Sequence, residues 1–395
     1  MFLFGETRLF YFHSFTISLF PFTIYRMRIL QISSAKTIGG GERHMIDLIQ
    51  GLIQRGNEVF LAASPTSPLL ERIPELTREN ILEINIKNSL DIFVARKLAG
   101  FIRKNTIEIV HAHLAKDYLP ASFAVRLASG AKFVLSRHVL FPMKYLQKYA
   151  LANAVKAIAV SAPVEANLQK IFPKEKIALV PYGIKIENWA ENDNEQLCRE
   201  FRFEHNIPFD ALLIGTLGEL KVLKGQRDFV LAANIIAEKF PETYFLSSGK
   251  DNSLKKEFRR ELKRLVKVFG LEDRFLFLDW VEDTAPLLAA LDIFVSASHS
   301  ESFGLAILEA MASGKAVVST KTGGAQELIE NDVTGKLVAI KEPVQLAAAV
   351  CELLEDEDLR QTIGENAQQT AKKKFGLESM VVETEKIYKE ILAAK

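Results

Sequence analysis

The strongest constraint on the fold is an alternation of short apolar runs with amphipathic segments, which begins at Met27. Seven runs in the first half of the chain read as strands, namely RILQIS, EVFLAA, ILEINI, IEIVHAH, KFVLSRH, AIAVS and IALVPYG. The segments between them, such as ERHMIDLIQGLIQRG, place apolar residues near i, i+3, i+4 and i+7, which is typical of helices. Strands that alternate with helices predict a mostly parallel sheet that is covered on both faces.

The alternation is interrupted by a polar segment from Glu187 to Phe209 and then begins again. The second series of apolar runs is ALLIGTLG, TYFLSSG, RFLFLDW, DIFVSAS, AVVST and KLVAI. Two series and a length of 395 residues favour two domains with a cleft between them. We therefore predict an α/β protein with two doubly wound, Rossmann-like domains, at 27–205 and 206–375, and a last helix at 376–395.

Residues 1–26 have a different character, because they are rich in Phe, nearly free of charge and interrupted by Pro21. A membrane span needs about 20 apolar residues, and a signal peptide needs a basic start and a small-residue cleavage site. The segment fits neither description. Two interpretations remain, a misassigned start with Met27 as the true first residue, or an anchor to a membrane surface.

Charge and cysteine content exclude several classes of function. With 50 Lys and Arg against 49 Asp and Glu, the chain has no basic excess that would predict nucleic-acid binding. Cys198 and Cys351 are far apart and show no metal-ligand spacing, which favours a reducing, cytoplasmic location without a disulfide framework. The histidines form no cluster in the sequence that indicates zinc, so we predict no metal site.

Loops after strands are where open parallel sheets bind ligands, and three such loops stand out in the first domain. Gly39-Gly40-Gly41 lets backbone N–H groups approach an anion at the start of a helix, although His44 breaks the dinucleotide fingerprint. His113 and the pair Arg137-His138 end the next predicted strands. An ordinary strand-to-helix turn and structural histidines are the alternative interpretations.

In the second domain, the stretch HSESFGLAILEAMASGKAVV contains Glu301 in a polar loop and Glu309 inside the apolar helix that follows. We expect this helix to begin near Gly304 or Leu305, with its first N–H groups facing an anion. A buried glutamate needs a polar partner, and a ribose diol would supply one. A salt-bridged structural glutamate is the alternative. Upstream, Lys224 could reach a phosphate as a point charge.

With these residues in place, the sequence resembles the group 1 (family 4) retaining glycosyltransferases of the GT-B fold, of the type that builds bacterial cell-surface glycan or lipopolysaccharide. Glu301 through Glu309 is similar to their E-x7-E element, and Gly323-Gly324 through Glu327 to the GG-x-x-E that follows it. The resemblance implies transfer of a sugar from a nucleotide-diphosphate sugar to an acceptor hydroxyl, with no cofactor required. It also implies that the leaving phosphate takes the acceptor's proton and that Glu301 does not act as a nucleophile.

The resemblance further implies roles for single residues. Glu301, His138 and Lys224 would be catalytic, with Lys224 neutralising charge on the departing diphosphate. His113 and Arg137 would lie on the acceptor side, and the last helix would pack back on the first domain. The donor would be bound by Gly40, Gly41, Lys221, Lys224, Ser302, Phe303, Gly304, Leu305 and Glu309.

One position departs from the family pattern. Where these enzymes have Gly-Arg-Leu before the lysine, this chain has Gly218-Glu219-Leu220. Loss of a charge-assisted bond to the diphosphate costs about 1.5–3 kcal/mol, unless Lys221 supplies the missing cation. This departure keeps two alternatives open beside the transferase, a nucleotide-sugar epimerase on the same fold and a degenerate protein that binds nucleotide sugars.

The acceptor is expected to be a glycan or a lipid-linked saccharide. Between Lys132 and Lys176 there are eight Lys and Arg against two acidic residues, with aromatic residues among them. Such a surface suits contact with an anionic membrane, at the inner face of the membrane for a cytoplasmic protein, although a solvated basic face is the alternative.

Overall fold

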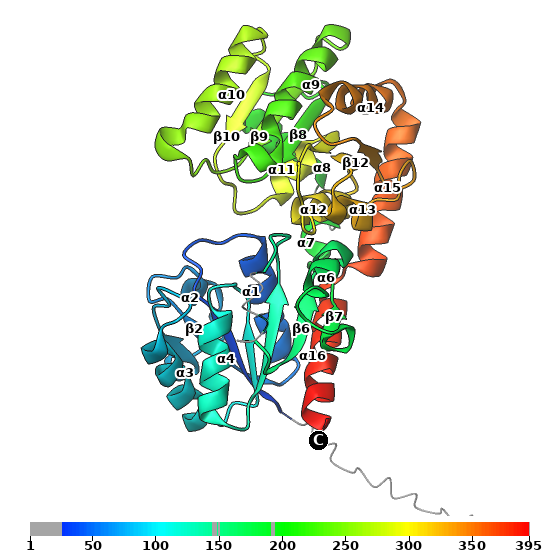
Figure 1. Cartoon of the computed structure of the whole chain (residues 1–395). Coiled ribbons are helices and arrows are strands. Elements are labelled where there is room, and N and C mark those ends of the chain that lie inside the picture. Colours follow the sequence, from blue (N-terminus) through cyan, green and yellow to red (C-terminus); the bar gives the residue numbers. More distant parts are fainter. Residues whose placement is uncertain (1–25, 144–147, 149–150, 191–193, 395) are drawn as a thin grey trace, which may run out of the picture.

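The computed structural model describes residues 26–143, 148, 151–190 and 194–394, and it divides into two α/β domains stacked one above the other (Figure 1). The predicted extension at residues 1–26 lies outside the described residues except for its last position, and so does part of the basic region between Lys132 and Lys176.

The first domain contains a seven-stranded parallel sheet in the order β3-β2-β1-β4-β5-β6-β7. Its strands are β1 (Arg28–Ser33), β2 (Glu58–Ala63), β3 (Ile81–Glu83), β4 (Ile109–Ala112), β5 (Lys132–Arg137), β6 (Ala154–Ala159) and β7 (Ile177–Leu179). Its helices are α1 (Gly40–Gln54), α2 (Leu69–Arg72), α3 (Ile92–Lys104), α4 (Tyr118–Ala128) and α6 (Ala162–Leu168). The chain leaves this domain through α7 (Glu187–Ala190) and α8 (Asn194–Glu204).

The second domain contains a six-stranded parallel sheet in the order β10-β9-β8-β11-β12-β13. Its strands are β8 (Leu213–Leu217), β9 (Tyr244–Ser248), β10 (Phe275–Leu278), β11 (Ile293–Ser296), β12 (Ala316–Thr320) and β13 (Lys336–Val338). The helices are α9 (Gln226–Lys239), α10 (Glu257–Val268), α11 (Ala285–Ala290), α12 (Leu305–Ala312), α13 (Gly323–Leu328), α14 (Pro343–Glu355) and α15 (Glu357–Lys374). The chain then returns to the first domain as α16 (Leu377–Ala393). The predicted fold class, two doubly wound parallel sheets, is confirmed.

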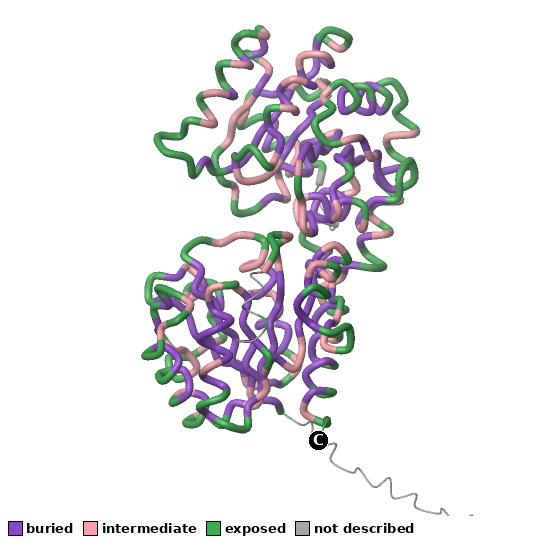
Figure 2. Tube along the Cα trace, viewed as in Figure 1, coloured by how far each residue is buried: buried purple, intermediate pink, exposed green. Residues whose placement is uncertain are grey.

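Both sheets are buried on their two faces, which explains why their strands are continuous apolar runs (Figure 2). In the first domain, α3 and α4 cover one face, while α1 and α16 cover the other. In the second domain, α9, α10 and α14 pack on one face, and α11, α12 and α13 pack on the other. Strand order reverses between β1 and β4 and again between β8 and β11, so the loops after these strands flank the two switch points where ligands bind in such sheets.

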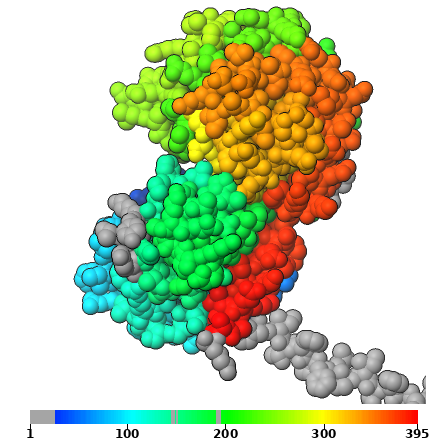
Figure 3. Space-filling view, turned by 45° about the vertical axis from the view of Figure 1, so that its right-hand side comes forward, coloured from blue at the N-terminus to red at the C-terminus, as the bar shows by residue number. Residues whose placement is uncertain are grey.

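The two chain crossings between the domains lie side by side. Ile184 N–H donates to the carbonyl of Phe375 at 3.0 Å, and Leu377 N–H donates to the carbonyl of Ile184 at 2.9 Å. After the second crossing, α16 lies along the first domain, as the red segment in Figure 3 shows. A Cβ added to Gly51 of α1 would lie 2.4 Å from Val381 of α16, so the absence of a side chain lets the two helices approach closely.

Glu385 anchors α16 to the first domain. Its carboxylate accepts bonds from Nε and Nη2 of Arg55, both at 3.0 Å, and from Nδ2 of Asn57 at 2.9 Å. Burial raises the pKa of Glu385, but hydrogen bonds from Asn57, Lys389 and Arg55 outweigh it and leave the pKa below its usual range. The depressed pKa means that this stabilisation is present at neutral pH and is lost as the pH falls through the folded-state pKa.

Glu385→Gln is expected to lower the free energy of unfolding by about 2–3 kcal/mol at pH 7, because it leaves Arg55 without its buried charge partner. Urea denaturation of the two proteins measures the difference. Glu383→Gln is the matched control, since Glu383 lies on the same helix with an exposed side chain. An equal change in both variants would contradict the anchoring role.

Candidate active site

A cavity of about 700 Å³ lies between the two domains and is lined by residues of both. From the first domain it receives the loop after β1, with Gly40 and Gly41, and His138 after β5. From the second domain it receives the loops after β8 and β11 and the start of α12. The cavity therefore lies at the carboxyl edges of both sheets, next to both switch points.

Helix α12 carries Glu309 into this cavity. The helix begins at Leu305 as expected, and Gly304 precedes it with a φ of 104°, a conformation that favours glycine. Glu309 is 3% exposed, accepts from Nη1 of Arg43 at 2.6 Å and accepts from the Thr284 hydroxyl at 3.1 Å. Burial raises the pKa of the Glu309 carboxyl, and the Arg43 charge and these bonds offset part of that rise.

The partner of Glu309 thus comes from the opposite domain. Arg43 belongs to α1, and its Nη2 also donates to the carbonyl of Glu282 at 3.2 Å. Arg72 pairs with the Glu282 carboxylate across the same gap. Two arginines of the first domain therefore bind acidic or carbonyl oxygens of the second domain.

Glu301 and Lys224 form a second charged pair. Nζ of Lys224 lies 2.5 Å from Oε2 of Glu301, and the Ser298 hydroxyl donates to the same oxygen at 3.4 Å. Lys224 ends a short 3₁₀ turn, Val222–Lys224, and is followed by Gly225 at a φ of 67°. A Cβ at Gly225 would lie 1.9 Å from the Ala297 carbonyl, so glycine is required to bring this lysine beside the loop of Glu301.

Glu219, the residue that departs from the family pattern, is bound by two nearby side chains. Nζ of Lys221 lies 2.5 Å from Oε2 of Glu219, and Nδ2 of Asn252 donates to Oε1 at 3.0 Å. Partial burial raises the pKa of Glu219, but the bonds from Lys221 and Asn252 and the nearby lysine charges outweigh it and lower the pKa below its usual value. Lys221 lines the cavity, and its charge is paired with Glu219, the residue that replaces the usual arginine.

The two glycine-rich motifs of the second domain pack directly on each other. Gly324 N–H donates to the Glu301 carbonyl at 3.1 Å, and a Cβ at Gly324 would lie 2.4 Å from the Phe303 carbonyl. Glu327 extends from α13 to the first domain, where its carboxylate accepts from the N–H of Ala162. Burial raises the pKa of Glu327.

On the first-domain side, the glycine loop lies against His138. A Cβ at Gly41 would be 3.3 Å from the His138 ring, and a Cβ at Gly40 would be 3.1 Å from the Leu305 side chain across the cavity. The Ser302 hydroxyl donates to the His138 carbonyl at 2.8 Å, which joins the two domains at the same place. A side chain at Gly40 would therefore crowd Leu305 of the second domain, and one at Gly41 would crowd His138.

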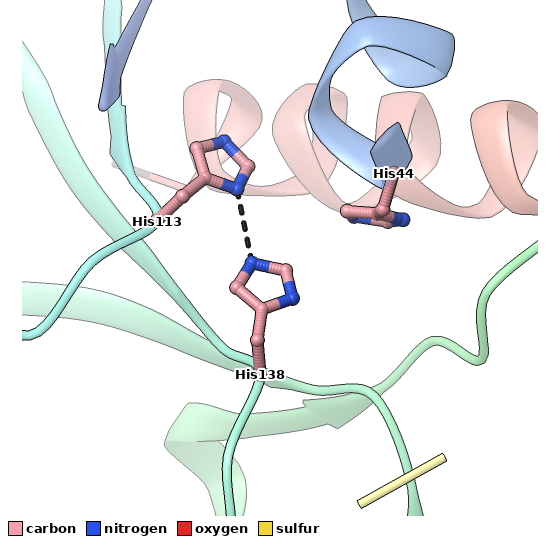
Figure 4. A group of neighbouring side chains, drawn as sticks. All are labelled: His44, His113 and His138. Carbon is pink, nitrogen blue, oxygen red and sulfur yellow. Dashed lines mark hydrogen bonds between the residues drawn. The ribbon is translucent and has the colours of Figure 1, made fainter. Parts of the chain in front are cut away.

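Four histidines gather behind the cavity wall, and Figure 4 shows three of them. Nδ1 of His113 lies 3.2 Å from Nε2 of His138, and the His44 ring approaches this pair from α1. Ring nitrogens of the three residues lie within 4.8 Å of one another, a spacing that a metal ion could bridge. Burial lowers the pKa of His44 to about 3 and the pKa values of His111, His113 and His138 well below the usual range, so all four rings are neutral.

Most of the predicted site residues meet in this one cavity. Its lining contains Gly40, Gly41, His138, Lys221, Lys224, Glu301, Ser302, Phe303, Gly304, Leu305 and Glu309. His113 and Arg137 do not line it. His113 lies behind His138, and Arg137 is buried, with its guanidinium donating to the Phe141 carbonyl.

Three residues of the site were not singled out from the sequence. Arg43 follows the three glycines and lies in the first turn of α1, but nothing in the sequence indicates that it reaches Glu309. Thr284 and Tyr182 lie far from any motif and enter the cavity through the tertiary fold. Tyr182 belongs to the predicted strand run IALVPYG, but β7 ends at Leu179 and Tyr182 lies in the segment that follows it.

Family models match both domains. The model described as "Glycosyl transferases group 1" matches residues 199–370, and the model described as "Glycosyltransferase Family 4" matches residues 38–188. The lipopolysaccharide core biosynthesis glycosyltransferase LpsE of Rhizobium meliloti is 30% identical over 90% of this chain and 96% of its own length. The N-acetyl-alpha-D-glucosaminyl L-malate synthase of Bacillus anthracis is 26% identical over 91% of this chain and 96% of its own length.

A solved structure shares the whole architecture. The crystal structure of a glycosyltransferase from Rickettsia africae superposes with a TM-score of 0.84 at 26% identity. It covers 94% of this chain and 100% of its own, so both domains and their connection are shared.

Proposed function

Because this chain belongs to the group 1 glycosyltransferases, we propose that it moves a sugar from a nucleotide-diphosphate sugar to an acceptor hydroxyl with retention of anomeric configuration. The observation that carries the proposal is the convergence of Glu309, the start of α12 and the Lys224–Glu301 pair in one cavity between the domains. The buried carboxylate of Glu309 can accept hydrogen bonds from a ribose, and the N-terminus of α12 can bind a diphosphate. Lys224 can stabilise the negative charge that develops on that diphosphate as it leaves.

The ion pairs suggest how a donor would enter. Arg43 occupies Glu309 and Lys224 occupies Glu301 in the structure. A ribose diol would replace Arg43 on Glu309, and the diphosphate would attract Lys224. Glu301 then stays beside the transferred sugar, and His138 with the Gly40-Gly41 loop forms the wall on the first-domain side. Neither glutamate is assigned a nucleophilic role, because in this proposal both serve to bind the donor.

For the pathway, we propose synthesis of a cell-surface glycan, lipopolysaccharide or lipid-linked saccharide, supported by the similarity to LpsE. None of the helices in the described residues is both long and apolar enough to cross a membrane. Contact with an anionic membrane surface through the basic region 132–176, at the cytoplasmic face, remains a proposal. It is supported by the exposed Phe141 and by exposed lysines such as Lys170 and Lys174 in that region.

A screen of the full-length protein against nucleotide sugars and free nucleotides, without added metal, tests the proposal. Thermal stabilisation by one nucleotide diphosphate, with slow release of sugar from the matching donor, is the expected result. The anomer of the released or transferred sugar, identified by NMR, tests retention. Stabilisation by none of the nucleotides would contradict the proposed function and favour a protein without donor binding.

Glu219→Arg is expected to tighten nucleoside diphosphate binding about tenfold, because it adds a cation and releases Lys221 from its partner. Calorimetric titration with UDP and GDP measures the change. Glu242→Arg makes the same charge change at an exposed position before β9 and serves as the control. Equal affinity in both variants would contradict a repulsive role for Glu219. Tighter binding without transfer would favour the degenerate binding protein.

A further inference from the structure

A continuous chain of hydrogen-bonded side chains runs through the first domain to the cavity wall. It begins at Ser136, passes through α16 at Tyr388 and ends at Tyr182. Its links are Ser136–His111 at 2.8 Å, His111–Tyr388 at 2.5 Å, Tyr388–Gln31 at 3.3 Å, Gln31–His113 at 2.7 Å, His113–His138 at 3.2 Å and His138–Tyr182 at 2.7 Å. The ion pairs Arg43–Glu309 and Lys224–Glu301 of the cavity take no part in it.

Every member of this chain is buried or lies in the cavity wall, and the imidazoles are neutral because burial holds their pKa values low. A neutral imidazole has one donor nitrogen and one acceptor nitrogen. The buried Tyr388 hydroxyl has one proton and two side-chain partners in this chain, so when it accepts from one partner its proton goes to the other. With every buried donor satisfied in this way, the choice of donor at one link determines the donors at all the others. Gln31 makes this choice, because its amide has an oxygen that only accepts and a nitrogen that only donates.

On one side of Gln31, the amide oxygen faces Nε2 of His113, so that nitrogen donates and Nδ1 of His113 accepts. Nε2 of His138 must then donate to His113, which leaves Nδ1 of His138 to accept the hydroxyl proton of Tyr182. Both ring nitrogens of His138 are engaged in this arrangement.

On the other side, the amide nitrogen of Gln31 donates to the Tyr388 hydroxyl. Tyr388 then donates its own proton to Nδ1 of His111, and Nε2 of His111 donates to the Ser136 hydroxyl. All three histidines of the chain thus carry their proton on Nε2. The direction is uniform, from Tyr182 to Gln31 and from Gln31 to Ser136.

We propose that Gln31 and Tyr388 are positioning residues that fix the direction of this chain, so that Tyr182 offers its oxygen as a hydrogen-bond acceptor to a hydroxyl group of the bound sugar substrate. Tyr182 lines the cavity and packs against Phe303, with ring centroids 4.9 Å apart. Among the described residues, its hydroxyl has no other hydrogen-bond partner than His138. The substrate part rests on the proposed function, whereas the direction of the chain does not.

NMR of the full-length protein with ¹⁵N-labelled histidine tests the direction, because the two ring nitrogens report which one carries the proton. The expected result is the Nε2–H tautomer for His111, His113 and His138. Nδ1–H tautomers at these residues would mean that the Gln31 amide is reversed, and would overturn the proposal. A change of the spectrum on addition of EDTA would also overturn it, since a metal ion would then join the histidines.

Tyr388→Phe removes one link and the acceptor that orients Gln31. The expected result is loss of the hydrogen-bonded Nδ1 signal of His111 and a mixture of tautomers at His113 and His138. Thr384→Val is the control, because it removes a buried hydroxyl on the same helix outside the chain. Gln31→Met removes the central link and gives a second test if Tyr388→Phe folds poorly. Unchanged tautomers at His113 and His138 in either folded variant would overturn the proposal.

Tyr182→Phe tests the substrate contact. Its KM for the nucleotide sugar that stabilises the wild type most, or for its acceptor, is expected to rise about tenfold, with kcat changed less, since one hydrogen bond is lost. Unchanged KM values would overturn the substrate contact. The tautomer spectra are recorded without any nucleotide sugar, so failure of the glycosyltransferase assignment itself would leave their result intact and the two failures can be told apart.

Discussion

Glu309→Ala is expected to abolish nucleotide-dependent stabilisation and to lower kcat/KM for the donor by roughly 10²- to 10⁴-fold. The carboxylate is 3% exposed at the base of the cavity and can accept two bonds from one ribose. Each hydrogen bond to a charged group contributes about 1.5–3 kcal/mol, and each 1.4 kcal/mol is a factor of ten. Thermal-shift titration with the best nucleotide of the screen, followed by donor hydrolysis, measures both effects.

The control separates donor binding from folding. Glu352→Ala removes a glutamate that pairs with Lys336 on the outer side of the same domain, at 2.7 Å. It is expected to bind nucleotide like the wild type. Glu309→Ala also leaves Arg43 and Thr284 without their partner, so its stability without nucleotide is measured first. A folded Glu309→Ala protein that keeps nucleotide affinity would remove Glu309 from the donor site.

Lys224→Met is expected to lower kcat by roughly 10²- to 10³-fold, because it removes the cation that would stabilise charge developing on the leaving diphosphate. The substitution also leaves Glu301 without its partner at 2.5 Å, so the donor would face an unpaired acid. Single-turnover measurement with the identified donor and acceptor isolates the chemical step from binding.

Lys250→Met is the matched control for this experiment, since Lys250 lines the same cavity with an exposed side chain. It is expected to change kcat only slightly. A Lys224→Met enzyme that loses affinity but keeps kcat would show that this lysine binds donor and transition state equally. Such an outcome would contradict its assignment to the leaving group.

The sequence predicted the fold well, because burial on both faces of a parallel sheet produces continuous apolar runs that are easy to recognise. Each predicted run overlaps one observed strand, and β1, β2 and β12 agree to the residue. Both edge strands of the first sheet are shorter than predicted: β3, predicted to continue to Ile86, ends at Glu83, and β7, predicted to continue to Gly183, ends at Leu179. β3 is an edge strand paired with β2 alone, so little hydrogen bonding holds its far end.

The site could be predicted only where its residues are close in sequence. Glu301, Gly304 and Glu309 belong to one loop and helix, so their spacing is itself a signal. Arg43 and Glu309 are separated by 266 positions, and their contact depends on how two domains approach each other. Neither periodicity nor local charge encodes that approach, and the same holds for Tyr388 of α16 and its link to Gln31 and His111.

The paired crossings at Ile184 and Phe375 bear on how the protein is made. Synthesis of the first domain starts first, but α16 covers one face of its sheet. This helix leaves the ribosome only after the whole second domain, so the first domain is completed last. The second domain has all of its strands available earlier and can fold as a unit. Until α16 emerges, the nascent first domain leaves exposed the part of its apolar cluster around Met45 and Leu48 that packs with α16 in the finished protein.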